Sequence, residues 1–441
     1  MADIFGDVDH VSSILVPFGA TAGDGWRIFG ISAVQLAPDL RSLLLLCDRG
    51  AIYGATVEFV NLSLSKINFH RRTEITAKNW LGLPMAMDAE GMVVDNSTGE
   101  VFLSSEPSHF FRLPLPWQAF IDEANASEVS SVEAEWLPFQ PNKVVQENEL
   151  PNQGLEAFTL TANNTLLAGL EGPLVKDDPS VRRLMEVDQT GRLLWSGFML
   201  VDNVPSTPLL LSELATLKLP KDHLGGPFFL GLERRWSRSL GNDIRLYLLQ
   251  LEGASNVSHC NAICDGACAF QGDGDCYLEE LTAIRKHLLF QWTPNHTLNG
   301  LMVDNYEAMT VVAPEALGYE DEDDLGGVAV LLVNDNNDNP RQIGTQFVLL
   351  RLPFARSGDE TVGEANFVTV LLLVVSSFCT FFLCIFLAVK LRCFASCWRM
   401  FLRTKMARTL HFSSHERHIT FEDHDQAEAE EGVSKLGRSA L

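Results

Sequence analysis

The sequence of residues 152–174 reads NQGLEAFTLTANNTLLAGLEGPL, and this stretch decides the fold of the 441-residue chain. Two short β-rich runs lie on either side of the turn residues Asn163 and Asn164. Such a pattern is typical of a β-hairpin. One acid, Glu156, lies near the start of the unit, and another, Glu171, follows its second run. The stretch therefore predicts a hairpin with one acid near the start of its first strand and another at the end of its second strand.

The same unit returns along the chain. The other copies read ISAVQLAPDLRSLLLLCDRG (31–50), DAEGMVVDNSTGEVFLSSE (88–106), LSELATLKLPKDHLGGPFFLGLERR (211–235), and DNYEAMTVVAPEALG followed by GGVAVLLVNDNN (304–337). One such sheet cannot bury its own apolar face, so successive units must pack against one another. We therefore predict an all-β, β-propeller-like domain of about five to seven blades. A pair of β-sandwiches is the alternative.

The run TQFVLLRLPF at residues 345–354 is expected to close the ring by pairing with the N-terminal strand. A hydrophobic content of 46% with 20% charged residues is typical of a folded chain. The formal net charge of -24 excludes nucleic acid as a partner, because nothing in the bulk would neutralise phosphates.

Residues 367–389 form a run of 23 residues that carries no charge. At about 1.5 Å per residue such a helix is long enough to cross the roughly 30 Å of bilayer hydrocarbon. Basic residues follow the run, namely Lys390, Arg392, Arg399, Arg403, Lys405 and Arg408. The positive-inside rule then predicts a single-pass protein in the lipid bilayer, with residues 1–366 extracellular or lumenal and the tail cytosolic.

The start of the chain does not fit this topology, because residues 1–18 are acidic and have no apolar signal region. We expect that the natural chain begins upstream or that an unusual route translocates the domain. A tail-anchored protein with a cytosolic head is the rival interpretation. Six N-x-S/T sequons favour the outer location, and they begin at Asn61, Asn96, Asn125, Asn163, Asn256 and Asn295.

These features divide the chain into segments. The predicted organisation is an N-terminal segment (1–29), a propeller ectodomain (30–356) with a Cys-rich insertion (260–276), a juxtamembrane linker (357–366), the membrane helix (367–389) and a disordered cytosolic tail (390–441). The insertion contains Cys260, Cys264, Cys268 and Cys276. Outside the cell two local disulfides are expected, with their pairing open, and a zinc site is the alternative.

The acids at the strand ends are the candidate site, because a propeller brings equivalent strand ends together around its axis. The sequence contains no G-x-S-x-G, H-E-x-x-H or P-loop motif. The candidate catalytic residues are Glu90, Glu156, Glu233, Arg234 and Glu307, and the candidate metal ligands are Asp48, Glu106, Glu171, Asp335 and Asn336. So many carboxylates repel one another and need cations, the arginine or raised pKa values to coexist. Metal-assisted hydrolysis and general acid–base catalysis are both open.

At these residues the sequence resembles a known family, the phytase-like domain described as having esterase-like activity of phytase. The stretches that carry the resemblance are DAEGMVVD with FLSSE, NQGLEAFTLTANNTLLAGLE, LSELATL with FFLGLERRW, DNYEAMTVV, LLVNDNN, LEGASNVS and KHLLFQW. The resemblance covers most of residues 30–352, and it implies hydrolysis of phosphate or other esters, with Ca²⁺ as the cofactor to consider. A membrane-anchored ester or phosphoester hydrolase is thus the first hypothesis, with a small-molecule substrate. A non-catalytic, ligand-binding propeller receptor is the second.

Overall fold

The structure is a computed structural model. It describes residues 4–78, 82–121, 130–137, 143–202, 208–219, 227–237, 241–266, 273–294, 303–321, 325–339, 342 and 344–354. The chain divides into two compact units, Met1–Arg356 and Ser357–Leu441, and every described residue lies in the first. The predicted linker, membrane helix and tail lie outside the described residues. Within the described part of the chain no helix is long and apolar enough to cross a membrane.

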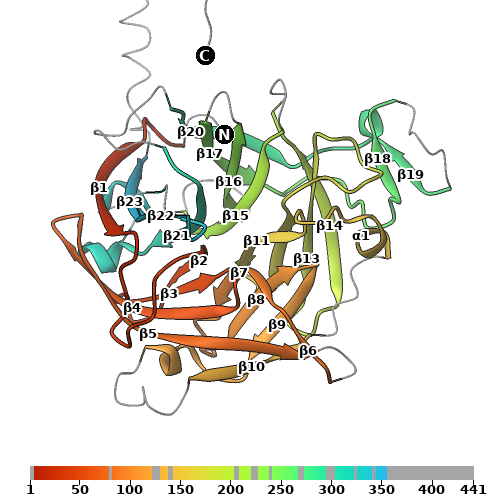
Figure 1. The fold of residues 1–441 in the computed structure, drawn as a ribbon. Coiled ribbons are helices and arrows are strands. Elements are labelled where there is room, and N and C mark those ends of the chain that lie inside the picture. The colour runs from red at the N-terminus through yellow and green to blue at the C-terminus, as the bar shows by residue number, and fades with distance from the viewer. Residues whose placement is uncertain are drawn as a thin grey trace, which may run out of the picture. The chain divides into compact units, whose positions relative to one another are not determined.

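The first unit is built from antiparallel four-stranded sheets, which we number as blades 1 to 5 (Figure 1). Blade 1 contains β2 (Ile31–Leu36), β3 (Ser42–Cys47), β4 (Ala51–Val60) and β5 (Ser63–Lys78). Blade 2 contains β7 (Asp88–Val94), β8 (Val101–Glu106), β9 (His109–Leu113) and β10 (Ser131–Trp136). Blade 3 contains β11 (Leu155–Leu160), β12 (Leu166–Leu170), β13 (Val181–Val187) and β14 (Leu193–Leu200). Blade 4 contains β15 (Leu210–Leu217), β16 (Phe228–Ser237), β17 (Gly241–Gln250) and β20 (Arg285–Trp292). Blade 5 contains β21 (Tyr306–Val312), β22 (Gly327–Asn334), β23 (Gly344–Pro353) and β1 (Asp9–Pro17).

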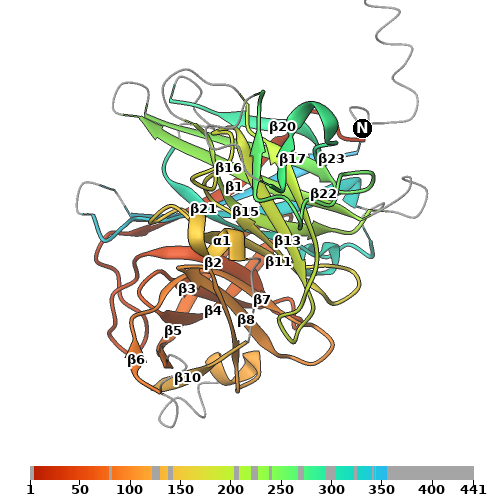
Figure 2. The same cartoon turned by 90° about the vertical axis from the view of Figure 1, so that its right-hand side faces the viewer.

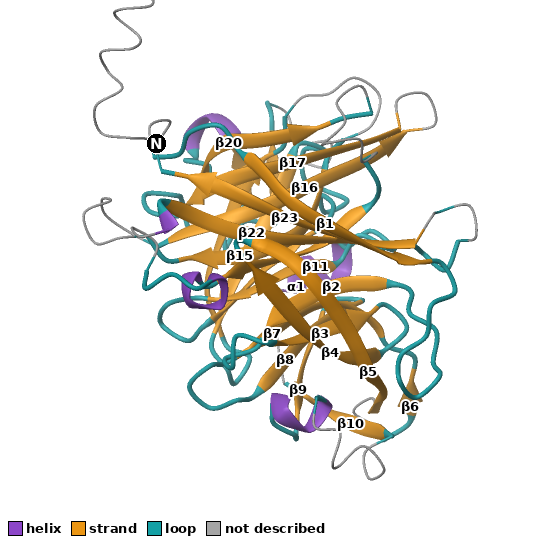
Figure 3. Cartoon of the chain, turned by 90° about the vertical axis from the view of Figure 1, so that its left-hand side faces the viewer, coloured by secondary structure: helices purple, strands orange, loops and turns teal. Residues whose placement is uncertain are grey.

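The remaining elements are short and lie between the strands (Figure 3). They are β6 (Pro84–Met85), η1 (Trp117–Phe120), α1 (Lys143–Asn148), β18 (Ala262–Cys264), β19 (Asp275–Tyr277), η3 (Leu278–Glu280) and η4 (Pro314–Leu317). Blades 1 and 2 are joined edge to edge, because β5 and β10 pair in parallel and merge the two blades into one sheet (Figure 2).

The innermost strands of the blades contact one another in a closed cycle. Strand β2 packs against β7, β7 against β11, β11 against β15, β15 against β21, and β21 again against β2. A closed cycle of four-stranded sheets around one axis is a β-propeller, here with five blades. The predicted propeller class is therefore confirmed, at the lower end of the predicted blade number.

The ring closes through the N-terminal strand, as the sequence predicted. Strand β1 pairs with β23, with Asp9 opposite Arg351 and Pro17 opposite Gly344. Residues 9–17 thus supply the outer strand of blade 5, although the sequence analysis assigned residues 1–29 to a separate N-terminal segment. Pairing the last blade with the first strand leaves no gap in the cycle of blades.

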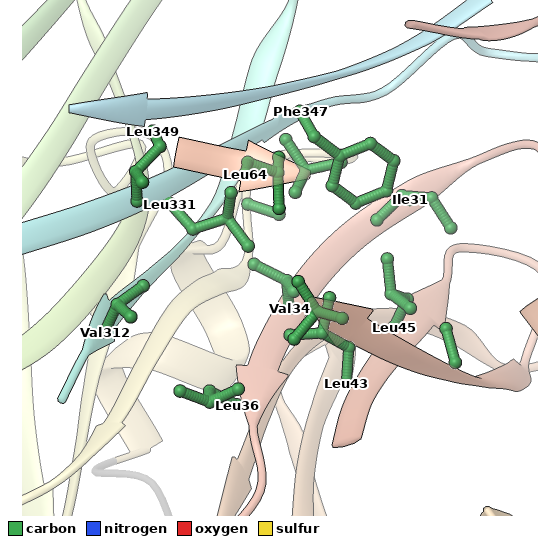
Figure 4. Packing of buried hydrophobic residues seen from close by; sticks show 14 of the residues in the cluster. Ile31, Val34, Leu36, Leu43, Leu45, Leu64, Val312, Leu331, Phe347 and Leu349 are labelled. Carbon is green, nitrogen blue, oxygen red and sulfur yellow. The ribbon is translucent and has the colours of Figure 1, made fainter. Parts of the chain in front are cut away.

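The hydrophobic core lies between neighbouring blades. Figure 4 shows Ile31, Val34 and Leu45 of blade 1 facing Leu331 and Phe347 of blade 5. All six residues of β3 are buried, because its neighbours β2 and β4 cover its edges and the adjacent blades cover its faces. Burying a Leu, Val or Phe side chain completely stabilises a fold by roughly 1.5–3 kcal/mol. The apolar runs of the repeated unit are therefore what packs blade against blade.

Candidate active site around Arg234

Every inner strand has a β-bulge near its start. The register shifts between Ile31 and Ala33, Ala89 and Gly91, Leu155 and Ala157, Leu211 and Glu213, and Tyr306 and Ala308. The extra residues are Ser32, Glu90, Glu156, Ser212 and Glu307. A bulge redirects one side chain out of the regular alternation, and bulges are frequent next to active sites. The bulge therefore presents an equivalent side chain from each of the five blades.

A second set of equivalent positions lies at the end of each second strand. These residues face the backbone two positions before the bulge: Asp48 faces Gly30, Glu106 faces Asp88, Glu171 faces Gly154, Arg234 faces Leu210 and Asp335 faces Asn305. The two sets together contain seven carboxylates, two serines and one arginine. We call these ten residues the carboxylate ring. Blade 4 thus contributes the arginine at a position where the other four blades contribute acids.

Arg234 is the hub of this ring. Its Nη2 lies 2.7 Å from Glu307 Oε1, 3.0 Å from Glu171 Oε1 and 3.3 Å from Glu156 Oε1. Its Nη1 donates to Asn305 Oδ1 at 3.2 Å. The guanidinium is only 17% exposed and the three glutamates are 6–8% exposed, so the charges interact with little solvent screening. One positive charge therefore faces three carboxylates.

The remaining carboxylates of the ring are not in the ion pairs of Arg234. Burial, reinforced by the charges of Glu307, Asp88 and Glu106, raises the pKa of Glu90 well above its ordinary value. Burial and the charge of Glu307 also raise the pKa of Asp335 well above its ordinary value. Burial raises the pKa of Glu106 to about 7, although the hydrogen bond that this carboxylate accepts from Gly154 N–H acts to lower it. These acids must hold protons or bind a cation at neutral pH.

Glu156 and Glu307, which lie beside Arg234, also have raised pKa values. Burial is the main cause for Glu156 and for Glu307, and Arg234 opposes it in both. One oxygen of Glu156, Oε2, is buried without a hydrogen-bond partner among the described residues. The ring therefore has two halves: three glutamates in ion pairs with the Arg234 guanidinium, and acids that make no ion pair with it.

This electrostatic arrangement makes stability depend on pH. In the unfolded chain these carboxyls titrate near 4–4.5, so above that pH the unfolded state binds fewer protons than the folded state, and stability falls as pH rises. We expect the melting temperature, measured by scanning calorimetry in chelator, to decrease from pH 7 to pH 8.5, above the range in which His10 and His109, whose pKa values burial lowers, would oppose the trend. Asp188 and Asp95 have lowered pKa values, so their contribution to stability changes only below about pH 4, outside this window. A melting temperature that rises across this window would contradict the assignment of protonated ring acids.

Glu233 does not join the ring, although the sequence analysis grouped it with the catalytic candidates. Neighbouring residues of a strand point to opposite faces, so Arg234 faces the ring and Glu233 faces away. Its carboxylate accepts a hydrogen bond from Lys286 Nζ at 2.8 Å, and Lys286 also lies 3.2 Å from Asp202. Lys286 in turn stacks over the Tyr247 ring. This group is an ion-pair network between blade 4 and Asp202, which lies between β14 and β15.

Two polar residues of the site were missed by the sequence analysis. Asp88 shares a hydrogen bond with Glu90, and burial raises its pKa. Asn305 donates from Nδ2 to Glu307 Oε1 at 2.7 Å while its Oδ1 accepts from Arg234. Both residues lie two positions before a bulged glutamate. That D-x-E and N-x-E spacing is the signal that could have identified them.

Asn336, a candidate metal ligand, is already engaged by protein groups. Its Oδ1 accepts from Gly30 N–H at 3.4 Å and from Asp338 N–H at 3.1 Å, and its Nδ2 donates to Thr345 Oγ1 at 2.9 Å. The asparagine therefore fastens the loop after β22 to the start of blade 1. Its neighbour Asp335 is the residue of this loop that belongs to the ring.

The cysteine insertion holds a disulfide. Cys260 and Cys276 are bonded to each other, Cys264 is also disulfide-bonded, and Cys268 lies outside the described residues. His259 with these two sulfurs is the one group of three potential metal-ligand atoms within 4.8 Å of one another among the described residues. Since the two sulfurs are bonded to each other, the zinc alternative is wrong for this group.

A large cavity lies at the other end of the inner strands. Its volume is about 1530 Å³, and its walls include Leu36, Val94, Leu160, Leu217 and Val312 from the five inner strands. One buried acid, Glu213, belongs to its wall and accepts the N–H groups of Phe158 and Leu214 through a single oxygen. Burial raises the pKa of Glu213 well above its ordinary value. The cavity and the carboxylate ring are thus at opposite ends of the inner strands.

A comparison with known protein families gives a match over most of the chain. The family model described as "Phytase-like: Esterase-like activity of phytase" matches residues 27–338. None of the curated proteins compared with the chain gives a match.

Solved propellers resemble the chain only distantly. The Dos1 propeller has 8% identity and a TM-score of 0.31, covering 74% of this chain and 69% of its own. The Cps50 (Swd1) β-propeller domain of Myceliophteria thermophila has 10% identity and a TM-score of 0.29, covering 74% and 97%. The RRP9 WD40 repeats have 10% identity and a TM-score of 0.33, covering 80% and 99%. The family match includes every residue of the carboxylate ring. The chain belongs to the phytase-like family.

Proposed function

We propose that the chain is a hydrolase of ester or phosphoester bonds and that the carboxylate ring carries out its chemistry. The observation that supports this most directly is the division of the ring into two electrostatic halves. Enzymes that cleave by general acid–base catalysis need one group that holds a proton and another that has lost it. Two sets of carboxyls in opposite environments provide such a pair.

The two halves suggest a role for each acid. Glu90 lacks a cationic partner and shares a hydrogen bond with Asp88, so it is the group that would donate a proton to the leaving oxygen. Glu307 makes the shortest contact with Arg234, 2.7 Å, and is the group that would accept a proton from water. Asn305 fixes its orientation through a hydrogen bond to the same carboxylate. Arg234 would stabilise negative charge that develops on the substrate.

A divalent cation is part of this proposal, with Ca²⁺ as the candidate. Asp48, Asp88, Glu90 and Asp335 supply hard oxygen donors that are not in the ion pairs of Arg234. Among the described residues no three of these carboxylates lie within 4.8 Å of one another, so they would have to draw together around the ion. When bound, the ion would polarise a phosphoryl or carbonyl oxygen. It would also offset the repulsion between the ring and an anionic substrate.

The proposed setting is the outer face of a membrane, with residues 367–389 as the tether. This part of the proposal rests on the uncharged run and its basic flank. The sequon asparagines Asn61, Asn96, Asn163 and Asn256 are exposed, which suits acceptors of glycans. Asn125 and Asn295 lie outside the described residues.

The test is hydrolysis by the purified full-length chain in detergent. We expect turnover of p-nitrophenyl esters or of phytate, loss of turnover in chelator, and recovery when Ca²⁺ is added. Turnover that survives chelation would remove the cation from the mechanism and leave acid–base catalysis by the ring. If no ester is cleaved with any divalent metal, the chain is a ligand-binding propeller and not a hydrolase.

A further inference from the structure

Three arginines, one in the segment between β1 and β2 and two in blade 1, stack on aromatic rings of that segment. Arg27 lies over Phe18 at 5.0 Å from the ring centroid, Arg49 over Phe29 at 4.9 Å, and Arg72 over Trp26 at 4.8 Å. All three rings belong to the stretch between β1 and β2, which ends where the carboxylate ring begins. A guanidinium over an aromatic face keeps its charge and gains a fixed orientation. The segment therefore holds three oriented cations.

Arg49 differs from the other two because its charge is not neutralised by an acid. Arg27 lies 2.6 Å from Asp338 and Arg72 lies 2.8 Å from Glu74. Among the described residues Arg49 makes no ion pair and no side-chain hydrogen bond, and its side chain is exposed. Its donors are available to a ligand.

The position of Arg49 places this free cation beside the carboxylate ring. Arg49 follows Asp48 directly in the turn between β3 and β4. Arg49 stacks on the aromatic side chain of Phe29. Phe29 precedes Gly30, whose carbonyl accepts the N–H of Asp48 at 3.0 Å. The Arg49 guanidinium is thus held against Phe29, next to Gly30, the residue that Asp48 of the carboxylate ring faces. An exposed guanidinium next to Asp48 is in a position to contact a substrate group bound at the carboxylate ring.

We propose that Arg49 binds an anionic group of the substrate and so selects negatively charged esters over neutral ones. A guanidinium fork pairs with two oxygens of a phosphate or carboxylate, and the stacked ring lowers the entropy cost of orienting it. This inference rests on the proposed hydrolase function for its kinetic readout. It adds the substrate class, an ester that carries negative charge next to the bond that is cleaved.

The experiment compares Arg49→Ala with wild type in the full-length chain, using phytate as the anionic substrate and p-nitrophenyl acetate as the neutral one. Loss of a charge-assisted contact is expected to raise KM for phytate by about 10- to 100-fold. The kcat for phytate and both constants for the neutral ester should stay within about twofold, because Arg49 does not touch the reacting carboxylates. Arg49→Lys should recover part of the phytate KM, since it keeps the charge but not the fork.

Arg41→Ala is the matched control, because Arg41 is an exposed arginine at the other end of the same hairpin, in the turn between β2 and β3. It should leave both substrates unaffected. Equal losses for the two substrates, or the same loss in Arg41→Ala, would overturn the role of Arg49.

If the chain hydrolyses neither substrate, the proposed function fails while the role of Arg49 can still be measured. Phytate affinity is then determined by titration calorimetry. A dissociation constant at least about 10-fold weaker in Arg49→Ala than in Arg41→Ala supports the anion site. Unchanged affinity, or no binding of phytate to wild type, refutes it.

Discussion

Replacing Glu156 or Glu307 with glutamine is expected to lower kcat/KM for ester hydrolysis by about 100-fold or more in each variant. Glutamine keeps the size of the side chain and a carbonyl oxygen that can still accept from Arg234, at 3.3 Å for Glu156 and 2.7 Å for Glu307. What it loses is the ability to take or give a proton. The measurement is steady-state kinetics on a p-nitrophenyl ester at several pH values, with Ca²⁺ present throughout.

Stability should separate this loss from a loss of structure. Each substitution removes one of several mutually repelling buried carboxylates, so we expect the melting temperature at pH 7.5 to be unchanged or slightly higher. Glu213→Gln is the matched control, because Glu213 is also a buried glutamate with a raised pKa, but it follows the bulge residue Ser212 on β15 and belongs to the cavity wall, not to the carboxylate ring. Its amide oxygen can still accept from Phe158 and Leu214. Full activity in Glu156→Gln and Glu307→Gln, or an equal loss in Glu213→Gln, would contradict catalysis by the ring.

Much of this architecture can be predicted from the repeated unit. Each copy contains an inner strand, a turn and a second strand, and the structure pairs these two strands in all five blades. The acids at the strand ends also follow from the pattern, because equivalent strand ends in a propeller must converge. The pairing of β5 with β10 could not be predicted, because a parallel contact between two outer strands produces no pattern in the sequence of either hairpin.

The choice between Glu233 and Arg234 could not be made from the sequence. Which of two neighbouring residues faces the axis depends on the register of β16 against β15, and a bulge at Ser212 sets that register. A bulge adds one residue to a strand, and no particular residue type marks its position. If side chains are assumed to alternate strictly between the two faces, the residues beyond the bulge are therefore assigned to the wrong face. The structure shows that the fourth blade supplies a positive charge and not a further acid. The ring is therefore asymmetric in charge although its backbone positions repeat.

Arg234 should be the residue on which the folding of this asymmetric ring depends most. Replacing it with methionine leaves Glu156, Glu171 and Glu307 buried with no positive charge in contact. Removing one partner of a buried charge network usually costs about 3–5 kcal/mol, because the remaining charges stay desolvated. We expect a loss of this size in the free energy of unfolding at pH 8, measured by urea denaturation of residues 1–356. Arg192→Met is the control, because the Arg192 side chain is 76% exposed and its pair with Asp188 should contribute about 0–1 kcal/mol.

The pH dependence then decides why Arg234 matters. At pH 5 Glu156 and Glu307, whose pKa values are raised, can take up protons. This removes charges that Arg234 balances, so the loss caused by Arg234→Met should shrink. The double variant Arg234→Met with Glu307→Gln should likewise be less destabilised at pH 8 than Arg234→Met alone, because one uncompensated carboxylate is gone. If the loss is the same at both pH values and in both backgrounds, Arg234 acts through packing. If it follows the charge of the glutamates, the arginine is the counter-ion that lets blades 3 and 5 bring their acids together, and that is the arrangement on which the proposed chemistry depends.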